Sequence, residues 1–301
     1  MLDKLIKHPL GYFEVLEKPS QEELDQYYSQ KYYQQSKGAY QANYTPEEIT
    51  FFNNKIDQKY SILLELFRRS NYLPDQPSLL DVGCGEGWAL QFFKEKSWSV
   101  TGIDYSSYGC ETFNPDCLDN LIVGNIYEQM NALKKRAEKY DVIWLTHVLE
   151  HVLNPISLLQ ELKELLSDKG ILLIQVPNDF SNLQIHLLKN EWIDHPFWVA
   201  IPDHISYFNK ESFMNLAEHT GWIVQTLSTS YPIDLNLFNE RTNYITESAV
   251  GKTVHQSRVR IENFFHDELP DKGQTLYQEM AKVGLGRDLI AFMNKKNPFT
   301  S

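Results

Sequence analysis

Short apolar runs alternate with helical segments through the middle of the chain. The runs are bounded by turns and lie at 78–82, 99–104, 120–123, 140–146 and 170–176. Alternation of this length is typical of a parallel sheet with helices on both faces. Two later runs, at 222–230 and 288–295, bring the expected strands to seven. The pattern predicts a doubly wound α/β fold around a mostly parallel seven-stranded sheet.

The segments that flank this core predict two helical additions. Residues 1–75 carry two capping boxes, Ser20 with Glu23 and Thr45 with Glu48, and they read as a helical cap. Residues 233–284 have a helical pattern and are too long for an ordinary loop, so we expect a helical insertion before the last strand. The core is then expected at 76–232 together with 285–297.

One face of the insertion is polar. His255, Arg258 and Glu262 recur at helical spacing, while Val254, Ile261 and Phe265 form the apolar stripe. Polar faces of this kind are mostly solvated, so we expect the first three side chains to face water.

Charge and composition exclude several classes of protein. The formal net charge is −12 and the pI is near 5.2, which disfavours a nucleic-acid partner. No run approaches the roughly 20 apolar residues of a membrane span, and the first residues lack the apolar segment of a signal peptide. The three cysteines have no CxxC spacing and read as reduced thiols. We therefore expect a cytoplasmic protein without a membrane span; the sequence does not indicate an oligomeric state.

A glycine-rich turn follows the first apolar run. In LLDVGCGEGW (79–88), Gly83, Gly85 and Gly87 lack Cβ atoms, so the turn can fold sharply and a ligand can approach the backbone. The next run ends at Asp104, where a carboxylate can accept hydrogen bonds from both hydroxyls of a ribose. Strand, turn, helix, strand and terminal acid in this order predict a site for an adenosine-containing cofactor.

The surroundings of the turn distinguish between cofactors. Dinucleotide sites prefer G-x-G-x-x-G, whereas the spacing here is G-x-G-x-G followed by Trp88. Glu86 and Asp81 would repel a pyrophosphate. A cofactor that carries an ammonium and a sulfonium suits this acidic setting better, and an NAD-dependent oxidoreductase is disfavoured.

The run from 79 to 180 resembles the class I S-adenosylmethionine-dependent methyltransferases, which have a Rossmann-like fold. The resemblance rests on LLDVGCGEG, on GNIYE after the third expected strand, on YDVIWLTHVLEHVLNP and on GILLIQVPN. The segment 231–295 is similar, more loosely, to methyltransferases of bacterial sugar and polysaccharide biosynthesis. The cofactor implied is S-adenosylmethionine.

The resemblance also implies a set of cofactor-binding residues. The glycine turn would hold the methionine part of the cofactor, Asp104 the ribose, and Asn125 would lie beside the adenine. The full expected set is Asp81, Gly83, Cys84, Gly85, Gly87, Asp104, Tyr105, Asn125, Ile126, Thr146 and His147. Tyr27, Tyr28, Tyr32 and Tyr33 either close over the cofactor or pack in the core.

The sequence His147-Val148-Leu149-Glu150-His151 carries a competing interpretation. H-x-x-E-H on a helix is a zinc-peptidase signature in which two histidines hold the metal and the glutamate is the base. Here His147 follows an apolar strand directly, and E-H-x-x-x-P recurs in the methyltransferases. We therefore expect no metal site, and zinc hydrolysis remains an alternative.

The acceptor of the methyl group is expected past the fourth and fifth strands, where ligands bind in open α/β sheets. His204 lies there and is the candidate general base for an acceptor hydroxyl, because its ordinary pKa of about 6.5 suits proton transfer at neutral pH. A structural role for His204 is the alternative. The expected acceptor is a small molecule or glycan, first a sugar hydroxyl and second a quinone-like or secondary metabolite. A domain that binds the cofactor without catalysis is a further alternative.

Overall fold

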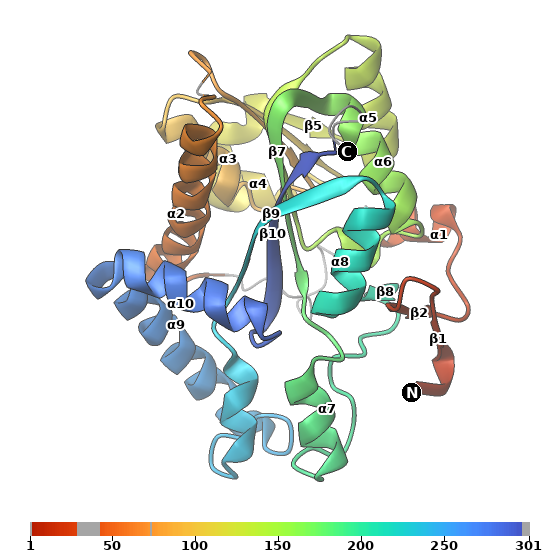
Figure 1. The fold of residues 1–301 in the computed structure, drawn as a ribbon, viewed down its shortest axis with the longest axis vertical. Coiled ribbons are helices and arrows are strands. Elements are labelled where there is room, and N and C mark those ends of the chain that lie inside the picture. The colour runs from red at the N-terminus through yellow and green to blue at the C-terminus, as the bar shows by residue number, and fades with distance from the viewer. Residues whose placement is uncertain (1, 29–42, 73, 297–301) are drawn as a thin grey trace.

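The computed structural model describes residues 2–28, 43–72 and 74–296. Its main feature is a seven-stranded sheet with the strand order β5-β4-β3-β6-β7-β10-β9 (Figure 1). The strands are β3 (Ser78–Val82), β4 (Ser99–Asp104), β5 (Leu121–Val123), β6 (Tyr140–Thr146), β7 (Leu166–Pro177), β9 (Trp222–Thr229) and β10 (Asp288–Lys295).

All of these strands except β10 run in one direction. β3, β4, β5, β6 and β7 pair in parallel, whereas β10 pairs antiparallel with both β7 and β9. The chain reverses its strand order at β3, from which it moves first to β4 and β5 and then back to β6. Sheets of this kind bind ligands at that point, beyond the carboxyl ends of the strands. The predicted doubly wound, mostly parallel seven-stranded sheet is confirmed.

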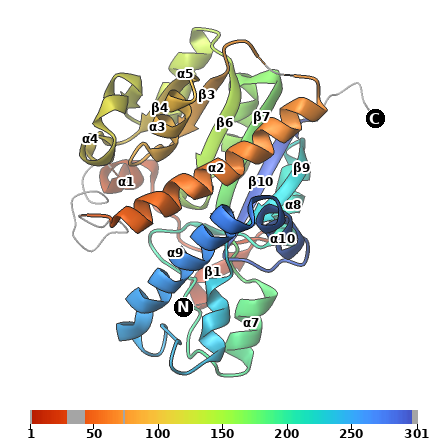
Figure 2. The same ribbon diagram turned by 90° about the vertical axis from the view of Figure 1, so that its left-hand side faces the viewer.

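Helices cover both faces of the sheet (Figures 1 and 2). Buried side chains of α5, α6 and α8 pack on one face, and those of α2, α3 and α4 pack on the other. The apolar residues of the strands are buried on both faces, as expected for a parallel sheet covered twice. The ranges of these helices are α2 (Pro46–Arg69), α3 (Trp88–Glu95), α4 (Tyr108–Phe113), α5 (Ile126–Lys135), α6 (Pro155–Leu165) and α8 (Lys210–His219).

A second, smaller layer lies beside the sheet and combines the N-terminal segment with the chain that follows β7. It contains α1 (Gln21–Gln26), α7 (Asn182–Lys189) and a three-stranded antiparallel sheet of β1 (Leu5–Lys7), β2 (Phe13–Val15) and β8 (Ser206–Tyr207). Its core joins Val15 and Leu24 to Leu187, Trp198 and Ile205. The N-terminal extension is therefore partly helical and partly strand. Its helices α1 and α2 begin at the two predicted capping boxes.

The segment before β10 contains the helices α9 (Gly251–Glu268) and α10 (Pro270–Lys282). Short 3-10 helices occur at Leu2–Lys4, Pro115–Asn120, Leu149–His151, Ile233–Phe238 and Ser248–Val250. None of the helices in the described part of the chain is long and apolar enough to cross a membrane.

The expectation that the polar face of α9 is solvated is wrong for Arg258 and Glu262, whereas the His255 side chain is 38% exposed. The Glu262 side chain is 2% exposed, and its carboxylate accepts a hydrogen bond from Arg258 Nε at 2.7 Å. Lys55 of α2 lies 3.9 Å from the same carboxylate, and the Tyr277 hydroxyl of α10 donates to it. These charges are buried because α9 packs against α2 along this face, so the polar face makes a helix contact.

Candidate cofactor site

A cavity of about 270 Å³ lies beyond the carboxyl ends of β3, β4, β5 and β6. This is the edge of the sheet at which the strand order reverses, and it is the expected ligand position. The lining residues are Gln21, Leu24, Tyr28, Gly83, Cys84, Gly85, Glu86, Trp88, Asp104, Tyr105, Ile126, Tyr127, Thr146, His147, Val148, His151, Val152 and Leu153.

The glycine-rich turn after β3 forms one wall of this cavity. Gly83, Gly85 and Gly87 have φ angles of 74°, 55° and 78°, in the left-handed region that favours glycine. A Cβ atom on Gly83 would lie 2.4 Å from Val148 Cγ2, so the backbone passes too close to the β6 loop for any side chain. Hydrogen bonds from the Gly83 and Cys84 amides to the Ile103 carbonyl hold the turn against β4. The glycines thus bring backbone to the cavity surface.

Asp104 ends β4 and faces the turn. The Gly85 amide donates to its Oδ2 atom at 2.8 Å, and the Ser106 amide donates to its Oδ1 atom at 3.1 Å. Asp104 is only 5% exposed, yet it lines the cavity. Asp81 lies fully buried behind it, and burial together with the Asp104 charge raises the pKa of Asp81 to about 8. Asp104 is therefore the carboxylate presented to a ligand, whereas Asp81 is buried and does not line the cavity.

The charges around the cavity suit a ligand that carries positive charge. Its lining includes the acids Glu86 and Asp104 and, within the described residues, no lysine or arginine. The Trp88 indole and the Tyr44 hydroxyl donate to Glu86 at 2.6 and 2.9 Å, and burial raises its pKa. A pyrophosphate would meet repulsion here. The exposed backbone, Asp104 and this acidic lining fit S-adenosylmethionine.

The N-terminal helix α1 closes one side of the cavity. Asp25 Oδ1 accepts hydrogen bonds from Tyr105 Oη at 3.0 Å and from Asn125 Nδ2 at 2.9 Å, which joins α1 to the ends of β4 and β5. Gln21 Nε2 donates to the same oxygen at 2.8 Å. Tyr28 follows α1 and lines the cavity. Its aromatic neighbours Tyr32 and Tyr33, singled out with it from the sequence, lie outside the described residues.

Most of the predicted cofactor residues meet at this cavity. Gly83, Cys84, Gly85, Asp104, Tyr105, Ile126, Thr146 and His147 line it. Asp81, Gly87 and Asn125 do not. Gly87 is the N-cap of α3, and Asn125 Oδ1 accepts from the Tyr127 and Glu128 amides as the N-cap of α5. The amide group of Asn125 is thus occupied by α5 and by Asp25.

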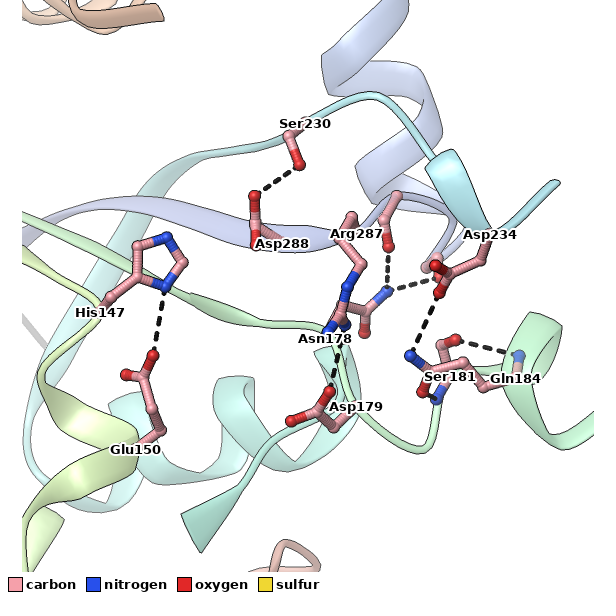
Figure 3. A network of polar contacts seen from close by, with 12 residues as sticks. His147, Glu150, Asn178, Asp179, Ser181, Gln184, Ser230, Asp234, Arg287 and Asp288 are labelled. Atoms are coloured by element: carbon pink, nitrogen blue, oxygen red, sulfur yellow. Dashed lines mark hydrogen bonds and ion pairs between the residues drawn. The ribbon is translucent and has the colours of Figure 1, made fainter. Parts of the chain in front are cut away.

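His147 begins a chain of polar contacts that leads away from the cavity. Its φ of 56° places the backbone in the left-handed region, and its Nδ1 atom lies 3.2 Å from Glu150 Oε1 (Figure 3). Its Nε2 atom lies 3.0 Å from Gln175 Nε2, which also donates to Asp288 Oδ2 at 3.1 Å. The Ser230 hydroxyl donates to that Asp288 oxygen at 2.5 Å. The loop after β6 is therefore fixed to β7 and β10.

His204 lies behind the cavity lining and belongs to a different group. Its ring centroid is 4.9 Å from that of His151, and its Nδ1 atom is buried without a hydrogen-bond partner. Ligand atoms of Glu150, His151 and His204 lie within 4.8 Å of one another. His151 and Glu150 of the H-x-x-E-H segment thus meet His204, whereas His147 contacts Glu150 through its Nδ1 atom and Gln175 through its Nε2 atom. Glu150 and His151 lie in a short 3-10 helix, which differs from the long helix of a zinc-peptidase motif.

The sequence comparisons agree with this site. Residues 53–227, more than half of the chain, match the family model described as "Methyltransferase domain". Curated proteins named ubiquinone biosynthesis O-methyltransferase are similar over shorter stretches. The protein of Haemophilus ducreyi is 33% identical over 107 residues, 33% of this chain and 45% of its own length. That of Aeromonas salmonicida is 25% identical over 56% of this chain and 74% of its own length.

The chain thus spans about half the length of the first relatives it matches. Among solved structures, a SAM-dependent methyltransferase from Archaeoglobus fulgidus has 17% identity and a TM-score of 0.46, covering 79% of this chain and 94% of its own. The plantazolicin methyltransferase BamL in complex with SAH has 19% identity and a TM-score of 0.49, covering 82% and 86%.

Proposed function

Because this chain belongs to the methyltransferase domain family, we propose that it transfers a methyl group from S-adenosylmethionine to a hydroxyl oxygen of a small or medium-sized acceptor. The observation that carries the proposal is the cavity at the carboxyl edge of the sheet. Glycine backbone, a buried carboxylate and an acidic lining meet there. These features suit a cofactor that has a ribose and a positive charge but no phosphate.

The cofactor supplies an activated methyl group on a sulfonium. The chain's own residues bind and orient the cofactor and the acceptor. The glycine turn brings backbone to the ligand, Asp104 accepts from the ribose hydroxyls, and the apolar residues Ile126 and Val152 exclude water from the cavity. Transfer of this kind needs little covalent help from the protein, so positioning accounts for most of the catalysis.

Two acceptor classes remain as proposals. The relatives named ubiquinone biosynthesis O-methyltransferase support a quinone-like acceptor with an aromatic hydroxyl. The looser resemblance of residues 231–295 to methyltransferases of sugar and polysaccharide biosynthesis supports a sugar or glycan hydroxyl. The named relatives favour the first class. In either class the oxygen that accepts the methyl group must lose its proton.

That His204 removes this proton stays a prediction. Its ring stands behind His151, which lines the cavity, and burial lowers the pKa of His204 to about 4. A group with so low a pKa is a weak proton acceptor at neutral pH. Turnover in H204N tests the role: near-normal turnover would exclude His204 as the base.

Calorimetric titration with S-adenosylmethionine, with its demethylated product SAH and with NAD tests the cofactor. We expect S-adenosylmethionine and SAH to bind and NAD not to bind. The variant D104N should weaken S-adenosylmethionine binding at least tenfold, because the amide cannot accept both ribose hydrogen bonds. D119N, which changes an exposed aspartate, is the matched control and should bind as the wild type does. Binding of NAD alone would overturn the proposal.

A further inference from the structure

The cluster of Glu150, His151 and His204 contains buried polar atoms that have no hydrogen-bond partner within the described residues. Glu150 is 1% exposed, and its Oε2 atom is buried without a partner. His204 Nδ1 is buried without a partner as well. Leaving such atoms unsatisfied is unfavourable. Two orphaned atoms within one small cluster point to a group that the protein itself does not supply.

The orientation of His151 leaves a lone pair on its Nε2 atom. Its Nδ1 atom lies 2.7 Å from the Asp203 carbonyl oxygen, which only accepts, so Nδ1 carries the hydrogen. In the neutral ring, Nε2 then holds a lone pair, and it lies 3.8 Å from Glu150 Oε1. This lone pair and the carboxylate repel each other unless a proton or a metal cation lies between them.

We propose that Glu150, His151 and His204 bind one divalent cation. Ligand atoms of the three lie within 4.8 Å of one another, so one ion can reach all of them. Two imidazoles and one carboxylate are the ligand set of zinc and of several first-row transition metals, and three protein ligands leave open positions. The Asp203 carbonyl orients His151 from behind, as metal-bound histidines require.

The position of the cluster relates the ion to the methyl acceptor. His151 is both a ligand and a lining residue of the cofactor cavity. Resting on the proposed function, the ion takes the acceptor hydroxyl in an open position and lowers its pKa, so that its proton leaves to water. The oxygen then forms the new O–C bond while the S–C bond breaks and the sulfonium becomes a thioether. An acceptor with two adjacent oxygens, such as a catechol or a vicinal diol, fills two open positions.

This site differs from the zinc-peptidase interpretation of the H-x-x-E-H segment. That motif uses both of its histidines as ligands and its glutamate as the base. Here Glu150 is a ligand and His204 comes from a distant loop, while His147 is not a ligand and contacts Glu150 and Gln175.

Calorimetric titration of the EDTA-treated full chain with Zn²⁺, Mn²⁺ and Mg²⁺ tests the site. We expect one ion per chain with micromolar or tighter affinity for Zn²⁺ or Mn²⁺. E150Q and H204N should each weaken it at least tenfold. H219N, which alters an exposed histidine at the end of α8, should bind as the wild type does. Visible absorption of the Co²⁺-loaded protein gives an independent readout, because its bands should be lost in E150Q and H204N.

Unchanged affinity in both variants, or no bound ion in the wild type, would overturn the metal site. Circular dichroism identifies a variant that fails to fold. The metal affinity of the other variant then tests the site. SAH titration of the same samples separates the two proposals. If the wild type binds SAH but no metal ion, the metal site alone is rejected. If the wild type does not bind SAH, the proposed function is rejected.

Discussion

Lys59 is a charged residue in the interior of the protein. It lies on α2, is 8% exposed, and its ammonium is 5.2 Å from the centroid of the Trp144 ring. Burial and the neighbouring Lys55 lower the pKa of Lys59 to about 7, against the attraction of Asp288 and Asp81. The unfolded chain holds this proton up to its ordinary pKa near 10.5. Burial of the Lys59 ammonium therefore lowers the free energy of unfolding at pH 7. This loss becomes smaller as the pH rises toward 10.5.

Replacing Lys59 with methionine should stabilise the protein. K59M keeps most of the volume and removes the buried charge, so we expect the free energy of unfolding at pH 7 to rise by about 1 kcal/mol. Because the wild type regains stability with rising pH, the difference between the two proteins should shrink between pH 7 and pH 9. Urea denaturation at several pH values measures both effects. K135M, on an exposed position of α5, should change little; a lower urea midpoint for K59M would contradict the prediction.

At the scale of elements, α1 is held over the cavity through a single carboxylate oxygen. Asp25 Oδ1 accepts from Tyr105, Asn125 and Gln21. D25N removes the charge and weakens these hydrogen bonds, so α1 should separate more readily from the ends of β4 and β5. We expect S-adenosylmethionine to dissociate about five to ten times faster, a change of about 1–1.4 kcal/mol in the barrier.

Stopped-flow displacement of the cofactor measures this rate. E22Q lies on the same helix but on its exposed side, and it should dissociate at the wild-type rate. If D25N and E22Q behave alike, the contact of α1 with Tyr105 and Asn125 does not control cofactor release.

The strands and the glycine turn could be predicted from the sequence, but the partners of the turn across the cavity could not. Leu79–Val82, Gly83 and Asp104 lie in one local pattern in which strand, turn and acid have fixed spacing. Gln21, Leu24 and Tyr28 reach the same cavity from α1, and no spacing rule relates them to the turn. Strands β1, β2 and β8 are two or three residues long, too short for a period-two pattern.

Buried polar contacts were also beyond prediction from pattern alone. The face of α9 that carries Arg258 and Glu262 has the spacing of a solvated face, and only the packing of α9 against α2 buries it. That Asn125 lies beside the adenine, as the family resemblance implies, stays a prediction, and the structure adds that Asn125 is the N-cap of α5. For Arg258 and Glu262 the residue type permits either water or a buried partner, and the tertiary fold selects the partner.

At the scale of the whole molecule, the cofactor cavity joins α1 to the loops after β3, β4, β5 and β6. A ligand bound only by the folded chain stabilises it by RT ln(1 + [L]/Kd), about 2.7 kcal/mol at a concentration one hundred times Kd. SAH at that concentration should raise the midpoint of thermal unfolding by roughly 4 °C for a chain of this size. Differential scanning calorimetry measures the shift. D104N at the same SAH concentration should shift less, and no shift in the wild type would contradict binding at this cavity.

The antiparallel strand β10 has a consequence for synthesis on the ribosome. It lies between β7 and β9, so β9 has no neighbour in the large sheet until the last described strand has been made (Figure 1). Until then, the nascent chain presents β7 and β9 with unpaired backbone groups, which are templates for association between chains. Premature stop codons between residues 230 and 287 should therefore yield aggregates, even though every residue that lines the cofactor cavity has by then been translated.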